Sequence, residues 1–287
     1  MHTRSFRLPF HTPFAADTLL SFLDARAVPA IEEVRDGTYL RSIRLTGGTA
    51  VVAMTPRSDH VALSVSPEGS LDLDGLRDRA RRAFDLDADA DAIDARLAAD
   101  ATMTPLVARI PGIRVPGTFD GFELVVRAIF GQQVSVAGAR TSLGRLVSAA
   151  GTPLERPNGG ITHLFPTPEG VAELPPEAFG MPRARAETIR RVAELVAGGR
   201  LDLSGDAPLE ETLTRLGDVS GIGPWTLAYV AMRALRDPDA FMSGDLGVRK
   251  GFEALGLEST QTAMVDRAER WRPWRAYAVM HLWHHHV

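Results

Sequence analysis

Cysteine is absent from this sequence of 287 residues. Disulfides, thiolate zinc sites, iron–sulfur clusters and thiol nucleophiles are therefore excluded together. Long apolar runs are also missing, since no segment approaches the roughly 18 apolar residues that a membrane helix needs. The first residues lack the apolar stretch of a signal peptide. We therefore expect a soluble, cytoplasmic protein.

Lysine is almost absent as well. Lys250 is the only lysine, so a mechanism that needs an amine nucleophile could use only Lys250 or the N-terminus. The net charge of −4 argues weakly against a nucleic-acid partner, which usually meets a basic face. The acidic residues are concentrated in residues 71–101, however. Binding of a nucleic acid depends on a local basic patch rather than on the net charge of the chain.

Residues 1–100 are expected to form an α+β domain with an antiparallel sheet. Apolar residues recur at helical spacing in two segments and at strand spacing in three others. Gly47-Gly48 is a hairpin turn signal between two of the strand-like runs. The expected helices are Phe14–Ala27 and Leu76–Phe84, and the expected strands are Tyr39–Leu45, Ala50–Met54 and Val61–Val65.

The stretch Asp85–Asp94 alternates aspartate with other residues and raises the question of calcium. An EF-hand loop needs Gly at its sixth position and Glu at its twelfth. Counted from Asp85, these positions hold Ala90 and Arg96. We therefore interpret the stretch as a solvated linker that caps a helix.

Residues 101–287 are expected to be an all-α region. Breaks rich in Gly and Pro, such as Thr152–Gly160 and Phe165–Gly170, separate the helical patterns. The His284–His286 tail is interpreted as solvated rather than as a metal site. The expected helices are Phe119–Phe130, Val134–Ala149, Arg183–Ala197, Leu209–Leu216, Pro224–Leu235, Leu246–Leu255 and Thr262–His285.

A tight turn at Gly221-Ile222-Gly223 joins two of these helices. Pro224 follows at a first helical position, which suits its fixed φ and missing N–H. Ile222 is expected to pack between the two helices. The free N–H groups at the start of the second helix then form an anion site that suits a DNA phosphate. An ordinary turn between two helices is the alternative.

Asp245 lies one helix further on, at the start of Leu246–Leu255. Aspartate is a good N-cap, so this position alone requires no function. The alternative is a carboxylate at the mouth of a cleft beside the hairpin. A hairpin followed by such an aspartate is a more specific signature than either feature alone.

The sequence resembles the helix-hairpin-helix DNA glycosylase superfamily and, more closely, the AlkA-type 3-methyladenine DNA glycosylases. Besides the hairpin, the resemblance is carried by Phe22–Val28, Pro116–Ala139, Leu164–Glu169 and Glu269–Trp283. It implies a mainly α fold with an N-terminal α+β domain. It also implies a monofunctional glycosylase of base excision repair that flips and hydrolytically excises alkylated purines such as 3-methyladenine, leaving an abasic site.

The resemblance also implies roles for particular residues. Asp245 falls on the family's catalytic carboxylate, in a cleft. Aromatic residues that line the base pocket match Phe22, Trp225, Tyr229 and Trp283. Residues that contact DNA match Gln132, Gln133, Gly221, Gly223 and Thr226. Backbone carbonyls that can bind a structural monovalent cation match Gly217, Val219 and Gly221.

Further expectations follow from the same resemblance. Trp225 stands where bifunctional relatives carry a Schiff-base lysine, so lyase activity is not expected. No cofactor is needed for the chemistry. The expected partner is double-stranded DNA with damaged bases, and the protein is expected to be a nucleoid-associated monomer.

Two positions depart from the family pattern. Gln133 stands where an apolar residue fills the gap left by the flipped base, so the range of lesions is open. Ser243-Gly244 replaces the Pro-Asp pair expected before Asp245, which predicts a more mobile catalytic loop.

Two alternatives stay open. The first is a glycosylase of the same fold for deaminated or oxidised bases. The second is a non-catalytic DNA-binding repair protein, in which Asp245 is merely a helix cap.

Overall fold

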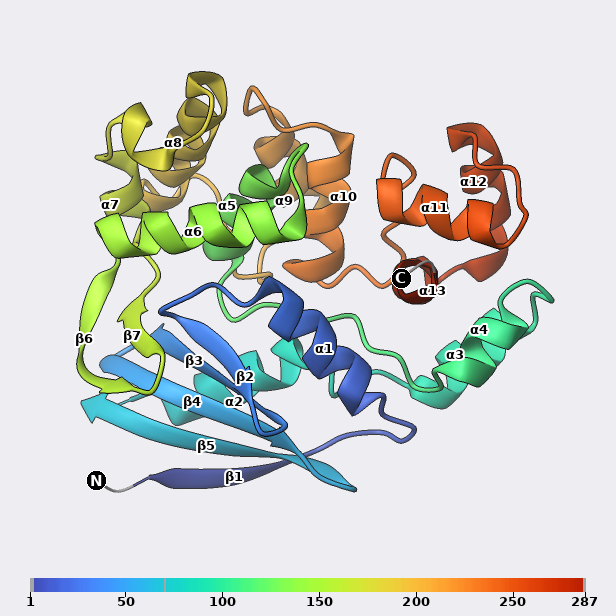
Figure 1. Cartoon of the computed structure of the whole chain (residues 1–287), viewed down its shortest axis with the longest axis horizontal. Helices are drawn as coiled ribbons and strands as arrows, with labels where there is room; N and C mark the ends of the chain where they lie inside the picture. Colours follow the sequence, from blue (N-terminus) through green and yellow to red (C-terminus); the bar gives the residue numbers. More distant parts are fainter. Residues whose placement is uncertain (1–2, 70, 286–287) are drawn as a thin grey trace.

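The computed structural model describes residues 3–69 and 71–285. A sheet domain with two helices lies at one end, and the remaining helices form the other end (Figure 1). The sheet domain contains β1 (Arg4–Pro9), α1 (Ala16–Arg26), β2 (Glu32–Arg35), β3 (Thr38–Leu45), β4 (Gly48–Pro56), β5 (His60–Gly69) and α2 (Leu73–Ala83).

The rest of the chain is mostly helical. Its elements are α3 (Ala90–Ala98), α4 (Thr104–Arg109), α5 (Gly121–Gly131), α6 (Val136–Ala150), β6 (Thr152–Asn158), β7 (Ile161–Leu164), α7 (Pro168–Ala172), η1 (Pro176–Phe179), α8 (Arg183–Ala197), α9 (Leu209–Gly217), α10 (Pro224–Arg233), α11 (Leu246–Ala254), α12 (Gln261–Ala268), η2 (Glu269–Trp271) and α13 (Arg275–His285).

The five strands form an antiparallel sheet in the order β1-β5-β4-β3-β2. Alternate residues of β3, β4 and β5 face α1 and α2, and this apolar layer is the core of the domain. The three expected strands are confirmed. Sequence patterns missed the edge strands β1 and β2, because each buries only one side chain and so lacks the alternation of a half-buried strand.

A second, two-stranded sheet corrects an expectation. Residues 152–160 were expected to be a break between helices, but β6 and β7 pair as a hairpin. The hairpin packs on the other face of the main sheet, where the Ser42 hydroxyl donates to the His163 carbonyl at 2.6 Å. Leu154 and Ile161 pack there against Leu40. Residues distant in sequence thus supply the apolar face that stabilises the hairpin.

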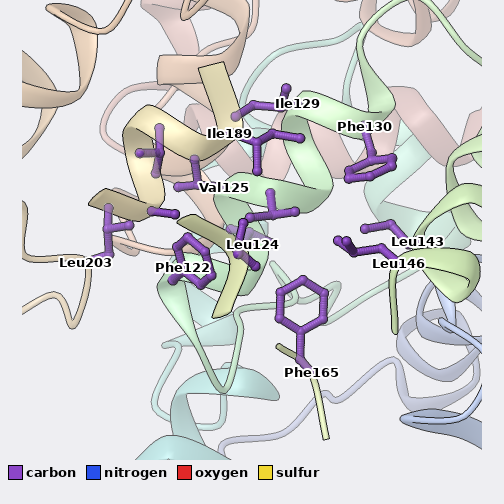
Figure 2. Packing of buried hydrophobic residues seen from close by; sticks show 14 of the residues in the cluster. Phe122, Leu124, Val125, Ile129, Phe130, Leu143, Leu146, Phe165, Ile189 and Leu203 are labelled. Atoms are coloured by element: carbon purple, nitrogen blue, oxygen red, sulfur yellow. The ribbon is translucent and has the colours of Figure 1, made fainter. Parts of the chain in front are cut away.

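Helix α5 lies at the centre of the first helical cluster. Nearly every side chain from Phe122 to Phe130 is buried, as expected of a helix surrounded by others. Figure 2 shows α5 residues packed against Leu143 and Leu146 of α6 and Ile189 of α8. This packing holds α5 and α10 side by side in the same cluster.

The C-terminal helices form a second cluster with α3 and α4. The expected single helix Thr262–His285 is wrong, because the chain divides into α12, the short turn η2 and α13. Pro273 lies at the break and cannot donate a helical hydrogen bond. The break lets Trp271 turn inward, where it is fully buried.

The acidic linker is not wholly solvated. Asp89 does cap α3, since its carboxylate accepts from the Ala92 amide. Asp85, however, accepts hydrogen bonds from the Tyr277 hydroxyl at 2.9 Å and the Val115 amide at 3.1 Å. Burial raises the pKa of Asp85 to about 6. The linker therefore joins the two halves of the molecule.

Four charged side chains meet where the sheet domain contacts α5. Arg41 Nη2 donates to Glu123 Oε2 at 2.8 Å, and Arg127 Nη1 lies 2.5 Å from Glu32 Oε1. Burial alone would raise the pKa of Glu32, but the charges of Arg127 and Arg41 lower it below its ordinary value. Two cations and two anions balance, and each domain contributes one of each.

His281 on α13 should make stability depend on pH. It is 1% exposed, and neither ring nitrogen has a hydrogen-bond partner among the described residues. Burial, and then the charge of His284, lower the pKa of His281 to about 3. The unfolded chain takes up this proton below about pH 6.5, so stability is lost as pH falls from about 6.5 to 3, by up to about 1.4 kcal/mol per pH unit.

Asp85 has the opposite effect on the pH dependence of stability. Its pKa is raised in the folded state, so the folded state binds a proton before the unfolded chain does and gains stability as pH falls. We expect His281→Leu to remove the acid loss and Asp85→Asn to steepen it. Urea unfolding at pH 7.5, 6.5 and 5.5 measures both. If the free energy of unfolding fell equally with pH in the wild type and in His281→Leu, His281 would not be the source of the acid loss.

Candidate active site

The hairpin forms as the sequence predicts. Helix α9 ends at Gly217, α10 begins at Pro224, and Ile222 packs inward in the first helical cluster. Gly221 has φ +91°, and a Cβ there would lie 2.3 Å from the Thr188 hydroxyl. Gly223 has φ −105°, and a Cβ there would meet open space. Only the first glycine is required by the turn.

These two glycines predict different mutational costs. Gly221→Ala is expected to destabilise the protein by about 1–3 kcal/mol, because the backbone is strained and Thr188 must move. Gly223→Ala is expected to stay within about 0.5 kcal/mol of the wild type. Urea unfolding of both variants checks this, and equal costs would show that the turn is not as described.

Asp245 is both a helix cap and the centre of a hydrogen-bond cluster. Its Oδ1 accepts from the Val248 amide at 2.9 Å and from Trp283 Nε1 at 2.8 Å. Its Oδ2 accepts from Trp225 Nε1 at 2.8 Å. Gly247 leaves room for this arrangement, since a Cβ there would lie 2.8 Å from Trp283 Cδ1. Three donors orient a carboxylate that stays partly exposed.

The expected aromatic residues come together around Asp245. Trp225 and Tyr229, one helical turn apart on α10, stack with ring centroids 5.3 Å apart. Tyr229 lies 6.5 Å from the ring of Trp283, and Trp283 stacks at 6.1 Å on Phe22. Phe22 is 4% exposed and does not line the open cleft. It supports the ring of Trp283 from behind.

An open cleft of about 1140 Å³ contains the mouth of this site. Asp245 is the only acidic residue of the described chain that lines it. The residues there that carry positive charge are Arg26, Arg127, Arg140, Arg185 and Arg233. The negative net charge of the whole chain therefore hides a local basic patch.

Exposed apolar side chains lie at the same cleft. Val134, Val136 and Leu246 are 47%, 44% and 53% exposed and all line it. Large apolar residues at a basic cleft indicate a binding surface rather than a solvated one.

Sequence reasoning missed two pocket arginines. The Arg26 guanidinium lies 3.7 Å from the ring centre of Phe22, and that of Arg233 lies 4.9 Å from it. Burial alone would raise the pKa of Tyr229, but the charges of Arg233 and Arg26 lower it below its ordinary value. The helical spacing of Arg26 from Phe22, and of Arg233 from Tyr229, was the available signal.

The residues expected to contact DNA lie in different environments. Gln132 Nε2 donates to the Gly221 carbonyl and to the Thr226 hydroxyl, both at 3.1 Å. Thr226 lines the cleft but is only 1% exposed, so its side chain braces the hairpin through Gln132. Gln133 is exposed with φ +59°, and Arg185 Nη2 donates to its side-chain oxygen at 3.3 Å.

The three carbonyls expected to bind a cation lie at the end of α9 and in the turn that follows it. The Val219 carbonyl accepts from the Ile222 amide at 3.0 Å, and the Gly221 carbonyl accepts from Gln132. A carbonyl oxygen has a second lone pair, so these hydrogen bonds are compatible with a cation. Within the described ranges, no three His, Asp or Glu side chains are grouped so as to hold a metal ion.

The chain belongs to the HhH-GPD superfamily of base excision DNA repair proteins, whose family model matches residues 126–276. The AlkA N-terminal domain family matches residues 5–120. The resemblance inferred from the sequence is thereby confirmed, as is the mainly α helix-hairpin-helix fold with its N-terminal sheet domain. No helix of the described chain is long and apolar enough to cross a membrane.

Matches to individual proteins agree with this family assignment. The chain is 33% identical to DNA-3-methyladenine glycosylase 2 of Escherichia coli (strain K12), over 97% of this chain and 96% of the relative. It is 43% identical, over 98% of its length, to the probable bifunctional transcriptional activator/DNA repair enzyme AlkA of Mycobacterium tuberculosis (strain CDC 1551 / Oshkosh). It spans 57% of that longer protein.

A solved structure shows the same fold. The 3-methyladenine DNA-glycosylase from Archaeoglobus fulgidus superposes with a TM-score of 0.85 at 24% identity, covering 97% of each chain.

Proposed function

We propose that this protein is a monofunctional DNA glycosylase of base excision repair that excises alkylated purines from double-stranded DNA. The observation that carries the proposal is Asp245, held by two indole N–H groups in a cleft that aromatic and basic side chains also line. A helix cap alone requires neither tryptophan.

The carboxylate acts on the sugar. As the C1′–N bond breaks, its electron pair stays on the base and positive charge develops on the deoxyribose. The fixed negative charge of Asp245 stabilises that charge without reorganising, because its hydrogen bonds already hold it in place. A water oxygen then bonds to C1′ and its proton passes to solvent, leaving an abasic site.

The stacked rings bind the flipped base. Trp225 and Tyr229 present aromatic faces, and an alkylated purine cation is attracted to such faces by roughly 0.5–2 kcal/mol. The free amides in the first turn of α10 suit a phosphate. Gln133 and the apolar Val134 beside it fill the gap left in the stack.

The test is release of free base from duplex DNA with a single 7-methylguanine, under single-turnover conditions. We expect base release and an abasic product that breaks only after alkali. DNA binding with no release would favour the non-catalytic alternative. Strand cleavage before alkali would contradict monofunctional hydrolysis.

The lysine distribution supports hydrolysis without lyase activity. Trp225 occupies the position of the Schiff-base lysine. Lys250 is exposed on α11 and is not among the cleft-lining residues. We therefore expect Lys250→Met to release base at the wild-type rate.

A monovalent cation at the carbonyls of Gly217, Val219 and Gly221 would bridge the hairpin to a phosphate. We expect tighter DNA binding in potassium chloride than in tetramethylammonium chloride at equal ionic strength. Equal affinities, measured by fluorescence anisotropy, would show that the hairpin binds DNA without the cation.

A further inference from the structure

The base pocket contains a phenol whose oxygen is bound by two cations. Tyr229 lies on α10 and lines the cleft beside Asp245. Arg233 Nη1 donates to the Tyr229 hydroxyl oxygen at 2.6 Å, and the Arg26 side chain also hydrogen bonds to it. The hydrogen bonds that described side chains make to this oxygen therefore both come from guanidiniums. A guanidinium has donors and no acceptor, so neither arginine can accept the phenol proton.

The other tyrosines of the chain, which has three in all, lie in the opposite environment. The Tyr277 hydroxyl donates to Asp85 Oδ2 at 2.9 Å, and the Tyr39 hydroxyl donates to Glu32. Burial and the neighbouring carboxylate raise the pKa of both phenols. For Tyr229 burial alone would also raise the pKa, but the two guanidiniums lower it below its ordinary value. Tyr229 is thus the tyrosine whose surroundings favour the phenolate.

Few other charged groups face Tyr229. Arg127 on α5 contributes a positive charge but is itself paired with two glutamates. Asp245 at the start of α11 is hydrogen bonded to Trp225, the ring that stacks on Tyr229. Helix α13 contributes the ring of Trp283, which does not titrate. The charged side chains of α9 are exposed. The guanidiniums at the hydroxyl therefore dominate the electrostatics of this phenol.

The same guanidiniums oppose the ligand of the proposed function. No Asp or Glu of the described chain lies within 4.0 Å of the Arg26 or the Arg233 guanidinium. An N-alkylated purine such as 7-methylguanine is a cation in DNA, so both arginines repel it. A phenolate at Tyr229 offsets one of these charges. Its electron-rich ring also attracts a cation more strongly than the ring of a neutral phenol does.

We propose that Tyr229 is a specificity-determining residue that ionises in the pocket, where Arg26 and Arg233 hold its phenolate, and that the phenolate is the form that binds a cationic alkylated purine. The phenol proton passes to solvent through the open cleft, and no bond to carbon changes. By linkage, a bound cationic base also favours loss of this proton. The proposal rests on the glycosylase function above and adds the means by which the pocket selects charged bases.

The first test is an ultraviolet absorbance titration, which distinguishes a phenolate from a phenol. We expect one tyrosine of the wild type to ionise below the ordinary tyrosine pKa of about 10. Tyr229→Phe should lose this early step, and the matched control Tyr277→Phe should keep it. Arg26→Met should move the step to higher pH, because a cation that stabilises the phenolate is removed. Circular dichroism at each pH checks that the chain stays folded.

The second test compares single-turnover release of 7-methylguanine by the wild type and by Tyr229→Phe across the same pH range. Comparing the two proteins at each pH cancels the ionisation of the base itself. We expect rates within about threefold of each other below the early step, and a wild type that is roughly tenfold faster above it. Binding of a duplex with an uncharged tetrahydrofuran abasic analogue should differ equally little between the two proteins at every pH.

Several results would overturn the proposal. An early step that is absent from the wild type, survives in Tyr229→Phe or stays in place in Arg26→Met would show that the guanidiniums do not hold a phenolate. A rate ratio that is the same at every pH would assign the hydroxyl a structural role and leave the glycosylase function standing. A gain with pH on the tetrahydrofuran duplex would show that the phenolate does not select the cation. A wild type that releases no base would remove both proposals, because there would be no cationic substrate to select.

Discussion

Asp245→Asn is expected to lower the rate of base release by roughly 10²–10³-fold. Asn keeps the cap on Val248 and the size of the side chain, but it removes the charge that stabilises the sugar cation. Its NH₂ group would also face the indole N–H of Trp225, where Asp245 now accepts a hydrogen bond. The measurement is single-turnover release of 7-methylguanine at saturating enzyme. All of the DNA is then bound, so a change in DNA affinity does not alter the measured rate.

Asp89→Asn provides the control. Asp89 caps α3 with the same geometry, its carboxylate accepting from Ala92 three residues on, but it does not line the cleft. The substitution there should leave base release unchanged, since Asn caps as well as Asp. If both variants released base at the wild-type rate, Asp245 would be a cap and no more.

Glu123→Gln is expected to destabilise the protein by about 3–5 kcal/mol, the usual cost of breaking a buried ion pair. The amide would leave Arg41 and Arg127 with Glu32 as their nearest anion. Urea unfolding gives the loss directly. Glu211→Gln, which breaks an exposed pair with Arg215 on α9, should cost no more than about 0.5 kcal/mol.

A double variant tests the interpretation of that loss. Arg41→Met with Glu123→Gln restores the balance of charge and keeps Arg127 paired with Glu32. Its cost should fall below the sum of the single costs by about 0.5–3 kcal/mol. Strict additivity would mean that Arg41 and Glu123 do not stabilise each other.

Local sequence determined the parts of the site that depend on neighbours along the chain. The turn needs Gly221 because of its positive φ, and Asp245 caps the helix that it precedes. Trp225 and Tyr229 share a helix face because they are one turn apart. The three inner strands of the sheet were recognisable because alternation is a property of a half-buried strand. Such features follow from backbone geometry within a few residues.

Tertiary structure alone decided which side chains meet. Trp283 reaches Asp245 from a different helix, Thr226 is almost fully buried, and the half-buried Asp85 accepts from Tyr277 despite its acidic surroundings. Arg26 lies over the ring of Phe22, whereas Arg127 is paired with Glu32 and Glu123. The burial of a side chain and its hydrogen-bond partners depend on packing between segments distant in sequence. A local sequence pattern does not predict that packing. The sequence therefore located the candidate carboxylate, Asp245, and only the fold showed which indole N–H groups hold it in the cleft.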